Sequence, residues 1–319
     1  MKRPALLGTL IATCLLAIVA KGQQPAKFPP TGPNFGPVQT AEKIADNLYL
    51  IRGAGGNSAV LIRHDGVLLV DTKLPNNGQP LLDEIKKLTD KPITHIINTH
   101  PHVDHTGGNA FFAGAFPGVQ IIVQENAKAS MEKDPAFQSD AGKAGLPTRT
   151  YKDHLTLFSG KEAVDLYHFG PAHTNGDTFV RFRAARVLHA GDVFAAKVSP
   201  LIDERNGGSA IVYGETVEKA VHGIPNVDRV ITGHGSILSH NPEDDVVPWQ
   251  DFVDYAEFNR LFAAHARASL AAGKSPEQAL GDFKLPAKFA GYVLNPPLPP
   301  GVPVYPGGNF AIAYKELGK

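Results

Sequence analysis

Three histidines and one aspartate fall within six residues, His100 to His105, of the stretch "NTHPHVDHTGGN". Imidazole nitrogens and carboxylates suit Zn²⁺, and iron or manganese accept them less selectively. His100 and His102, one residue apart, point the same way from an extended strand end, whereas the neighbours Asp104 and His105 diverge. We therefore expect this loop to serve two metal ions, with His100 and His102 on one and Asp104 and His105 on the other.

These four side chains do not complete two metal sites, so later segments must supply further ligands. Three candidates each follow a predicted strand: His173 in "GPAHTNGD", Asp192 in "HAGDVF" and His234 in "ITGHG". Loops at the strand ends of layered α/β folds converge on one edge, where active sites are found. The spacing of the three segments fits successive strands, so we expect them to meet the histidine cluster.

The elements that must position these residues are strands alternating with helices. In "SAVLIRHDGVLLVDTK", His64-Asp65-Gly66 separates two apolar runs and predicts a hairpin. Residues 78–90 place Leu81, Leu82, Ile85 and Leu88 on one helical face, and the strand "ITHIINTH" ends where the cluster begins. The alternation predicts a layered α/β domain over residues 41–245. Residues 134–150 lack a clean period and are expected to form a flap.

The last part of the chain has a different character. Residues 249–272 predict a long amphipathic helix and Pro276 to Asp282 a shorter one, whereas "NPPLPPGVPVYPGG" cannot be a regular helix. We interpret residues 246–319 as a C-terminal helical and Pro-rich extension packed on the main domain near the site entrance. An arm that contacts another subunit is an equal alternative.

The N-terminus is typical of a secretory leader, with Lys2 and Arg3 before an apolar run over residues 5–20. Spanning a bilayer takes about 20 apolar residues, so cleavage after residue 22 is favoured over a membrane anchor. Residues 23–40 predict an extended arm, and the mature protein is expected to be periplasmic or secreted. Because the one cysteine, Cys14, lies in the leader, a metal must be held by nitrogen and oxygen.

Charge does not indicate a macromolecular partner. The 31 lysines and arginines balance 31 aspartates and glutamates, so no excess charge favours nucleic acid or an anionic membrane. The expected partner is a small-molecule substrate, with no stable membrane anchor after leader cleavage and no prediction of oligomeric state.

The motifs "THPHVDHTGG", "AHTNGD", "AGDVF" and "GHG", in this order and preceded by "VLLVDT", resemble the metallo-β-lactamase superfamily over about residues 47–239. The resemblance implies a four-layer αββα sandwich with a dinuclear site along one edge. It implies two Zn²⁺ ions, with iron or manganese as substitutes. The residue roles that it implies are His100, His102 and His173 on the first metal, Asp104, His105 and His234 on the second, Asp192 bridging both, and Asp71 orienting the ligand loop.

The chemistry expected of such a site is hydrolysis. Two divalent ions lower the pKa of bound water from about 15.7 toward about 7, which gives a metal-bridging hydroxide that Asp104 would orient as the catalytic carboxylate. We predict a secreted dinuclear zinc hydrolase of an ester, lactone, thioester or β-lactam bond. Asp192 departs from the antibiotic-degrading members, which generally lack it or carry cysteine there, so a β-lactamase proper is the weaker interpretation.

Other functions stay open at this point. The first-metal ligands could hold a single non-haem iron, as in sulfur-oxidising members of the same superfamily. A metal-dependent scaffold without turnover would require a degraded ligand set, and all seven positions are filled. A purely structural zinc site is usually closed by four ligands and rich in cysteine, unlike this set.

Overall fold

The computed structural model describes residues 36–235, 242–296 and 305–318. The predicted leader, Cys14 and most of the predicted arm lie outside these residues. None of the described helices combines the length and apolar character that crossing a membrane requires.

The first sheet is mixed, antiparallel up to β4 and parallel from β4 onward. The predicted hairpin around Asp65 is confirmed, since Ile62 pairs with Val67 across the turn. The strands, in sheet order, are β1 (Glu42–Ala45), β2 (Leu48–Ile51), β3 (Ser58–Ile62), β4 (Val67–Val70), β5 (Ile93–Ile97), β6 (Gln120–Gln124) and β7 (Arg149–Tyr151).

The second sheet is also mixed, with β11 and β12 parallel and the other neighbours antiparallel. Its edge strand β13 lies just past the domain boundary expected at residue 245. In sheet order the strands are β13 (Val246–Pro248), β12 (Arg229–Ile231), β11 (Val187–His189), β10 (Phe179–Phe182), β9 (Val164–Tyr167) and β8 (His154–Leu157).

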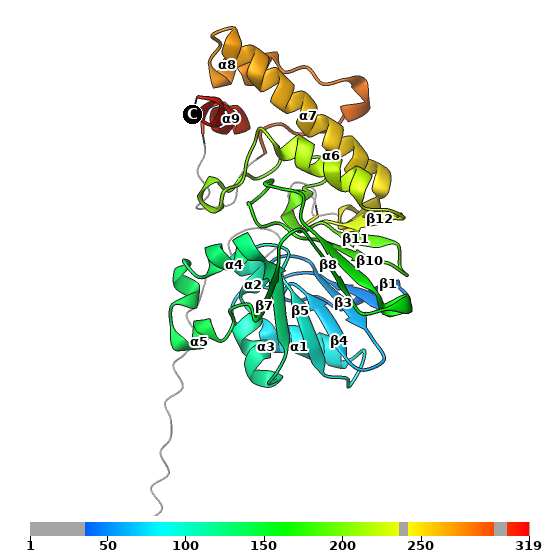
Figure 1. Cartoon of the computed structure of the whole chain (residues 1–319). Helices are drawn as coiled ribbons and strands as arrows, with labels where there is room; N and C mark the ends of the chain where they lie inside the picture. The colour runs from blue at the N-terminus through cyan, green and yellow to red at the C-terminus, as the bar shows by residue number, and fades with distance from the viewer. Residues whose placement is uncertain (1–35, 236–241, 297–304, 319) are drawn as a thin grey trace, which may run out of the picture.

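Strand β4 shows how the layers form, because all four of its residues are buried. Leu68 and Val70 join the core between the two sheets, while Val67 and Leu69 pack on the outer face with α1 and α3. Alternate residues of a strand point to opposite faces, so one apolar strand can serve two cores. Figure 1 shows α1 and α3 outside the first sheet and α6 and α7 outside the second, which confirms the predicted αββα sandwich.

The helices largely follow the predicted ranges, with shifted ends. α1 keeps Leu81, Leu82 and Ile85 buried but ends at Lys86, before the expected residue 90. α6 begins at Tyr213, four residues before the start at Val217 that the sequence predicts, because Tyr213 belongs to the same buried cluster as Val217. The helices are α1 (Gly78–Lys86), α2 (Val103–Thr106), α3 (Asn109–Ala115), α4 (Glu125–Met131), α5 (Asp140–Lys143), α6 (Tyr213–Gly223), α7 (Trp249–Ala271), α8 (Pro276–Asp282) and α9 (Asn309–Leu317).

Residues 134–150, expected as a flap, contain regular structure. They hold the short helix η1 (Pro135–Phe137), helix α5 and the start of β7, which pairs with β6. Phe137 is buried against Met131 and Val123. Helices of three or four residues are too short to show a hydrophobic period, so the sequence pattern could not reveal them.

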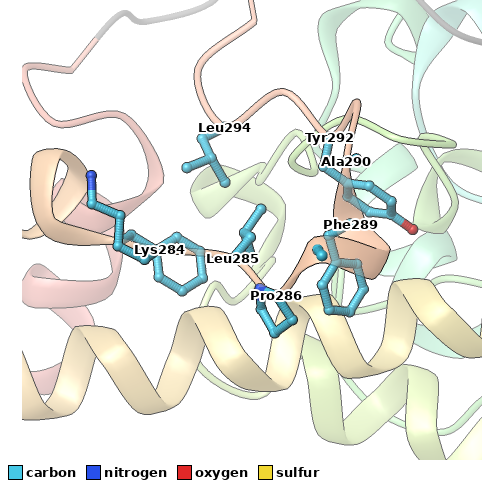
Figure 2. Close-up of a pocket in the computed structure, with 9 residues that line it drawn as sticks. Lys284, Leu285, Pro286, Phe289, Ala290, Tyr292 and Leu294 are labelled. Carbon is cyan, nitrogen blue, oxygen red and sulfur yellow. The ribbon is translucent and has the colours of Figure 1, made fainter.

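The C-terminal extension packs on the second sheet. Phe252, Tyr255 and Phe258 of α7 share one buried cluster with Tyr213 and Val217 of α6. α9 follows the Pro-rich stretch, which partly lies outside the described residues, and the sequence pattern did not predict it. A mostly apolar pocket of about 340 Å³ lies within the extension, and none of the seven candidate ligands lines it. Figure 2 shows its lining side chains. The pocket residues are Phe283, Lys284, Leu285, Pro286, Ala287, Phe289, Ala290, Tyr292 and Leu294.

Candidate metal centre

The seven predicted ligands come from loops that follow β5, β9, β11 and β12. The structure gathers them into two groups, and within each group the ligand atoms lie within 4.8 Å of one another. The structure therefore brings all seven sequence-predicted residues together. The first group is His100, His102, His173 and Asp192, and the second is Asp104, His105 and His234.

The first group is tightly packed around imidazole nitrogens. His102 Nδ1 lies 3.0 Å from His173 Nε2. Asp192 Oδ2 lies 3.7 Å from the Nε2 atoms of both His100 and His173. Three imidazoles with one carboxylate are a ligand set that Zn²⁺ accepts.

The second group is equally close. The Nε2 atoms of His105 and His234 lie 3.1 Å apart, and Asp104 Oδ2 lies 3.1 Å from His234 Nε2. Asp192 reaches this group as well, with Oδ1 at 3.2 Å from His105 Nε2 and Oδ2 at 3.4 Å from His234 Nε2. Its carboxylate therefore lies between the two groups.

One buried nitrogen indicates that these residues fit a cation. His100 Nε2 is buried and has no hydrogen-bond partner within the described part of the chain. Leaving such a group unpaired is costly, so native structures rarely do so without a ligand or ion. His100 Nε2 faces Asp192, and a divalent cation between them would coordinate both.

The histidines of the centre differ in their pKa values. Burial and the neighbouring His102 lower the pKa of His173 to about 4, which keeps that ring neutral. Burial opposes protonation of His234 too, but the carboxylates of Asp192 and Asp104 outweigh it and raise the pKa of His234 to about 9. Burial is likewise outweighed at His105, whose pKa the same carboxylates raise well above its usual range. Because histidine binds a metal through an unprotonated nitrogen, a cation at this group would compete with protons for these rings.

Asp71 contacts the second group through the Nδ1 atom of His105. Its Oδ2 lies 2.7 Å from His105 Nδ1, and its two oxygens accept hydrogen bonds from the backbone N–H and hydroxyl of Thr99. Asp71 is fully buried. A carboxylate on the far nitrogen fixes an imidazole so that its other nitrogen faces the metal, which is the contact that the predicted orienting role requires.

Two contacts of the same kind reach the first group, and sequence reasoning missed them. Asp203 Oδ2 lies 2.7 Å from His102 Nε2, and the carbonyl oxygen of Leu201 lies 2.7 Å from His173 Nδ1. No local motif marks these residues. Asp203 is 101 positions from His102 in the chain, so the contact exists only in the folded protein.

The loop between β2 and β3 packs against the second ligand group. Lys73, fully buried, donates from Nζ to the carbonyl oxygens of Ile51 and Gly56 at 2.6 Å each. Burial lowers the pKa of Lys73 to about 7. Gly56 packs directly against the ring of His105, where a Cβ atom would collide with it. This loop must therefore approach the ligands closely, which explains the glycine.

Asn57 connects the same loop to the one that carries His234. Its backbone N–H donates to the carbonyl oxygen of Gly233 at 2.7 Å, and its side chain donates to Thr232 O and Asp245 Oδ1. Gly233 in turn leaves no room for a Cβ atom beside Asp192. The two halves of the sandwich thus meet at the candidate centre.

The other described histidines lie outside both groups. His154 is half exposed, while His189 is buried and lies 3.0 Å from the carbonyl oxygen of Asn57. His64 forms a largely exposed cluster with Asp65 and Glu162, and Arg63 pairs with both of these carboxylates. The full set is His64, His95, His154, His168, His189, His222 and His265, and His240 lies outside the described residues.

Residues 52–234, more than half of the chain, match the family model described as "Metallo-beta-lactamase superfamily". This chain belongs to that superfamily. The match ends at His234, the last of the candidate ligands. The family predicted from the ordered motifs is confirmed.

Curated relatives of this superfamily member are distant. The chain is 28% identical over 144 residues to "Uncharacterized protein YobT" of Bacillus subtilis, covering 43% of this chain and 61% of that protein. It is 27% identical over 206 residues to "Metallo-beta-lactamase type 2" of Elizabethkingia meningoseptica, covering 60% and 77%. It is 30% identical over 122 residues to "Hydroxyacylglutathione hydrolase" of Gloeobacter violaceus, covering 38% and 42%. The latter two are named as enzymes, and the match spans less than two thirds of YobT and of the hydroxyacylglutathione hydrolase.

Solved structures confirm the fold. A metallo-β-lactamase from Pontibacter korlensis superposes with a TM-score of 0.58 at 16% identity, covering 70% of this chain and 99% of its own. The sec-alkylsulfatase Pisa1 from Pseudomonas sp. superposes with a TM-score of 0.65 at 15% identity, covering 87% of this chain and 50% of its own.

Proposed function

We propose that this superfamily member is a hydrolase that binds two divalent cations, two Zn²⁺ in the first place, and cleaves an ester, lactone, thioester or β-lactam bond in a small molecule. The observation that carries the proposal is the position of Asp192, 3.7 Å from His100 and His173 and 3.2 Å from His105. One carboxylate between two sets of imidazoles fits a shared ligand of a dinuclear site.

The proposed ligand sets follow the two groups. His100, His102 and His173 would hold the first cation, Asp104, His105 and His234 the second, and Asp192 both. When bound, the cations would supply a water of near-neutral pKa and a Lewis acid for the substrate carbonyl oxygen.

The exposure of the ligands indicates where substrate enters. The side chains of His100, His105 and His173 are buried, whereas His102, Asp104 and His234 are 24%, 17% and 16% exposed. The substrate would therefore approach from the side of these three residues. Asp104 is the more exposed of the two carboxylates, at 17% against 13% for Asp192, and the charges of His105 and His234 outweigh its burial and hold its pKa well below the usual range. It therefore stays ionised and can accept a hydrogen bond from the attacking water, which would orient that water.

A β-lactamase proper remains the second candidate, because two of the curated relatives are named "Metallo-beta-lactamase type 2" and one "Metallo-beta-lactamase IND-1". Asp192 argues for the other bonds, because the resemblance to the superfamily implies that the antibiotic-degrading members generally lack this aspartate or carry cysteine there. A panel of nitrocefin, an acyl-homoserine lactone, a thioester and a phosphodiester would separate these substrate classes.

The test combines that panel with metal analysis of the purified full chain. Two zinc ions per chain and hydrolysis of a panel member that chelation abolishes would support the proposal. One iron per chain with oxygen uptake would overturn it in favour of the sulfur-oxidising alternative. Asp104→Asn should lose turnover while it keeps the fold, and His154→Ala is the matched control because His154 lies outside both ligand groups.

We also propose that the chain is exported to the periplasm or the medium and loses residues 1–22. The support is Lys2 and Arg3 before the apolar run of residues 5–20. Mass spectrometry of the exported protein tests this, and an intact N-terminus in the membrane fraction would contradict it.

A further inference from the structure

Residues 200–211, here the 200–211 loop, hold the first ligand group from outside. Besides the contacts of Leu201 with His173 and of Asp203 with His102, the Asp203 backbone N–H donates to the carbonyl oxygen of His173 at 2.9 Å. Asp203 is itself fixed, since Asn206 Nδ2 donates to its Oδ2 and the Arg205 N–H to its Oδ1. The loop therefore sets how the rings of both histidines are aimed.

The other side of this loop is held by α9 of the C-terminal extension. Glu316 accepts hydrogen bonds from Ser209 Oγ at 2.6 Å and from the backbone N–H of Ala210 at 2.7 Å. At the beginning of the loop, Asn309 Nδ2 donates to the carbonyl oxygen of Pro200 at 2.8 Å. The helix that the sequence did not predict thus contacts both ends of the loop.

The middle of the loop is tied to the same helix by an ion pair. Lys315 Nζ lies 2.7 Å from Glu204 Oε1, next to Asp203 in the chain. This pair is partly exposed, so it contributes little by itself. The Glu316 contacts are stronger, because a carboxylate that accepts from backbone N–H and hydroxyl groups forms charge-assisted hydrogen bonds.

We propose that Glu316 is a positioning residue for the first cation site, which it serves by holding the 200–211 loop against α9 so that Asp203 and Leu201 aim His102 and His173. The proposal rests on the proposed function, in which these two histidines hold the first cation. It gives the extension a role in metal binding, through residues more than 100 positions from the ligands that they affect.

Metal affinity, measured on the full chain by competition of Zn²⁺ with a chromophoric chelator, tests this directly. Loss of a residue that hydrogen-bonds a metal-bound histidine typically weakens metal affinity about 10–100-fold. We expect Asp203→Asn to weaken the first zinc site within that range and Glu316→Gln to weaken it about tenfold, near its lower end. Glu257→Gln is the matched control, because Glu257 lies in the same extension but pairs with Lys288. It should leave both zinc constants unchanged.

A double variant separates positioning from general destabilisation. If Glu316 acts through Asp203, the Asp203→Asn/Glu316→Gln protein binds the first zinc about as weakly as Asp203→Asn alone. Fully additive losses would overturn the proposal. Ser209→Ala removes one donor to Glu316 without a charge change, and it should shift the first zinc constant in the same direction even if Glu316→Gln does not fold.

The outcomes also distinguish this proposal from the proposed function. Wild-type protein that binds two zinc ions, with Glu316→Gln and Ser209→Ala binding them equally well, would overturn the positioning role alone. Wild-type protein that binds no divalent cation would overturn the proposed function and the positioning role with it.

Discussion

The Nε2 atoms of His105 and His234 lie 3.1 Å apart, although 129 residues separate the two histidines in the chain. Two such nitrogens can share a hydrogen bond only if one carries a proton, and the carboxylates of Asp104 and Asp192 lie beside both. Negative charge and nitrogen lone pairs thus converge on one point. That convergence leads to the first prediction, which concerns metal removal.

Chelation should destabilise the fold, because a ligand that binds only the native state adds its binding free energy to stability. Free zinc at 100 times its dissociation constant would add about 2.7 kcal/mol to the free energy of unfolding. Urea unfolding with zinc and with excess chelator measures the difference. His154→Ala should show the same difference as the wild type, and equal urea midpoints in both conditions would argue against a cation site.

Asp192→Ser should weaken the second cation site more than the first. The Asp192 oxygens lie 3.2 and 3.4 Å from His105 and His234 but 3.7 Å from His100 and His173, so the second group loses the closer contacts. Each group keeps three ligands, a number that suffices for catalytic zinc, so the difference between the sites should come from these distances. Zinc dissociation constants from chelator competition provide the readout. Equal weakening of both sites would contradict a carboxylate placed closer to the second.

Asp71→Asn should weaken zinc binding about 10–100-fold, the usual effect of losing an outer partner of a metal-bound histidine. Asp71 has a φ of 58°, a conformation that Asn tolerates well, so the backbone should not be disturbed. Zinc titration of the variant measures this, with Asp83→Asn on the exposed face of α1 as control. Unchanged zinc affinity would remove Asp71 from the orienting role.

The sequence predicted which candidate ligands come together, but it did not predict the residues that support them, for a physical reason. His100 to His105 and Asp192 lie in short motifs at strand ends, where chain order and strand geometry determine where side chains meet. Asp203, Glu316 and Lys73 act through contacts that form only when distant segments pack, and no spacing in the chain records them.

In the fold, too, features set by local sequence patterns were predictable, whereas features set by packing of distant segments were not. The β3–β4 hairpin and the buried face of α1 follow from local alternation and helical period, so both were predictable. The early start of α6 at Tyr213 depends on packing against α7, and α9 begins after a Pro-rich stretch that local rules interpret as irregular.

Lys73 should make stability depend on pH above neutrality. Its pKa is about 7 in the folded protein, where burial disfavours the charge, and about 10.4 in an unfolded chain. Between these values the unfolded chain binds more protons, so the free energy of unfolding should rise as pH rises from 7 toward 10. Each pKa unit between the folded and unfolded values corresponds to about 1.4 kcal/mol in the free energy of unfolding.

Lys73→Met removes the titrating group, so the variant should gain less stability than the wild type between pH 7 and pH 9. It should also be less stable at pH 9, because the carbonyl oxygens of Ile51 and Gly56 lose their donor, at a cost of about 1–3 kcal/mol. Urea unfolding of metal-free protein at pH 7, 8 and 9 measures both effects. Lys87→Met, at an exposed position, should follow the wild-type profile. Parallel profiles for Lys73→Met and wild type would show that Lys73 stays protonated throughout this range, held by its two carbonyl partners.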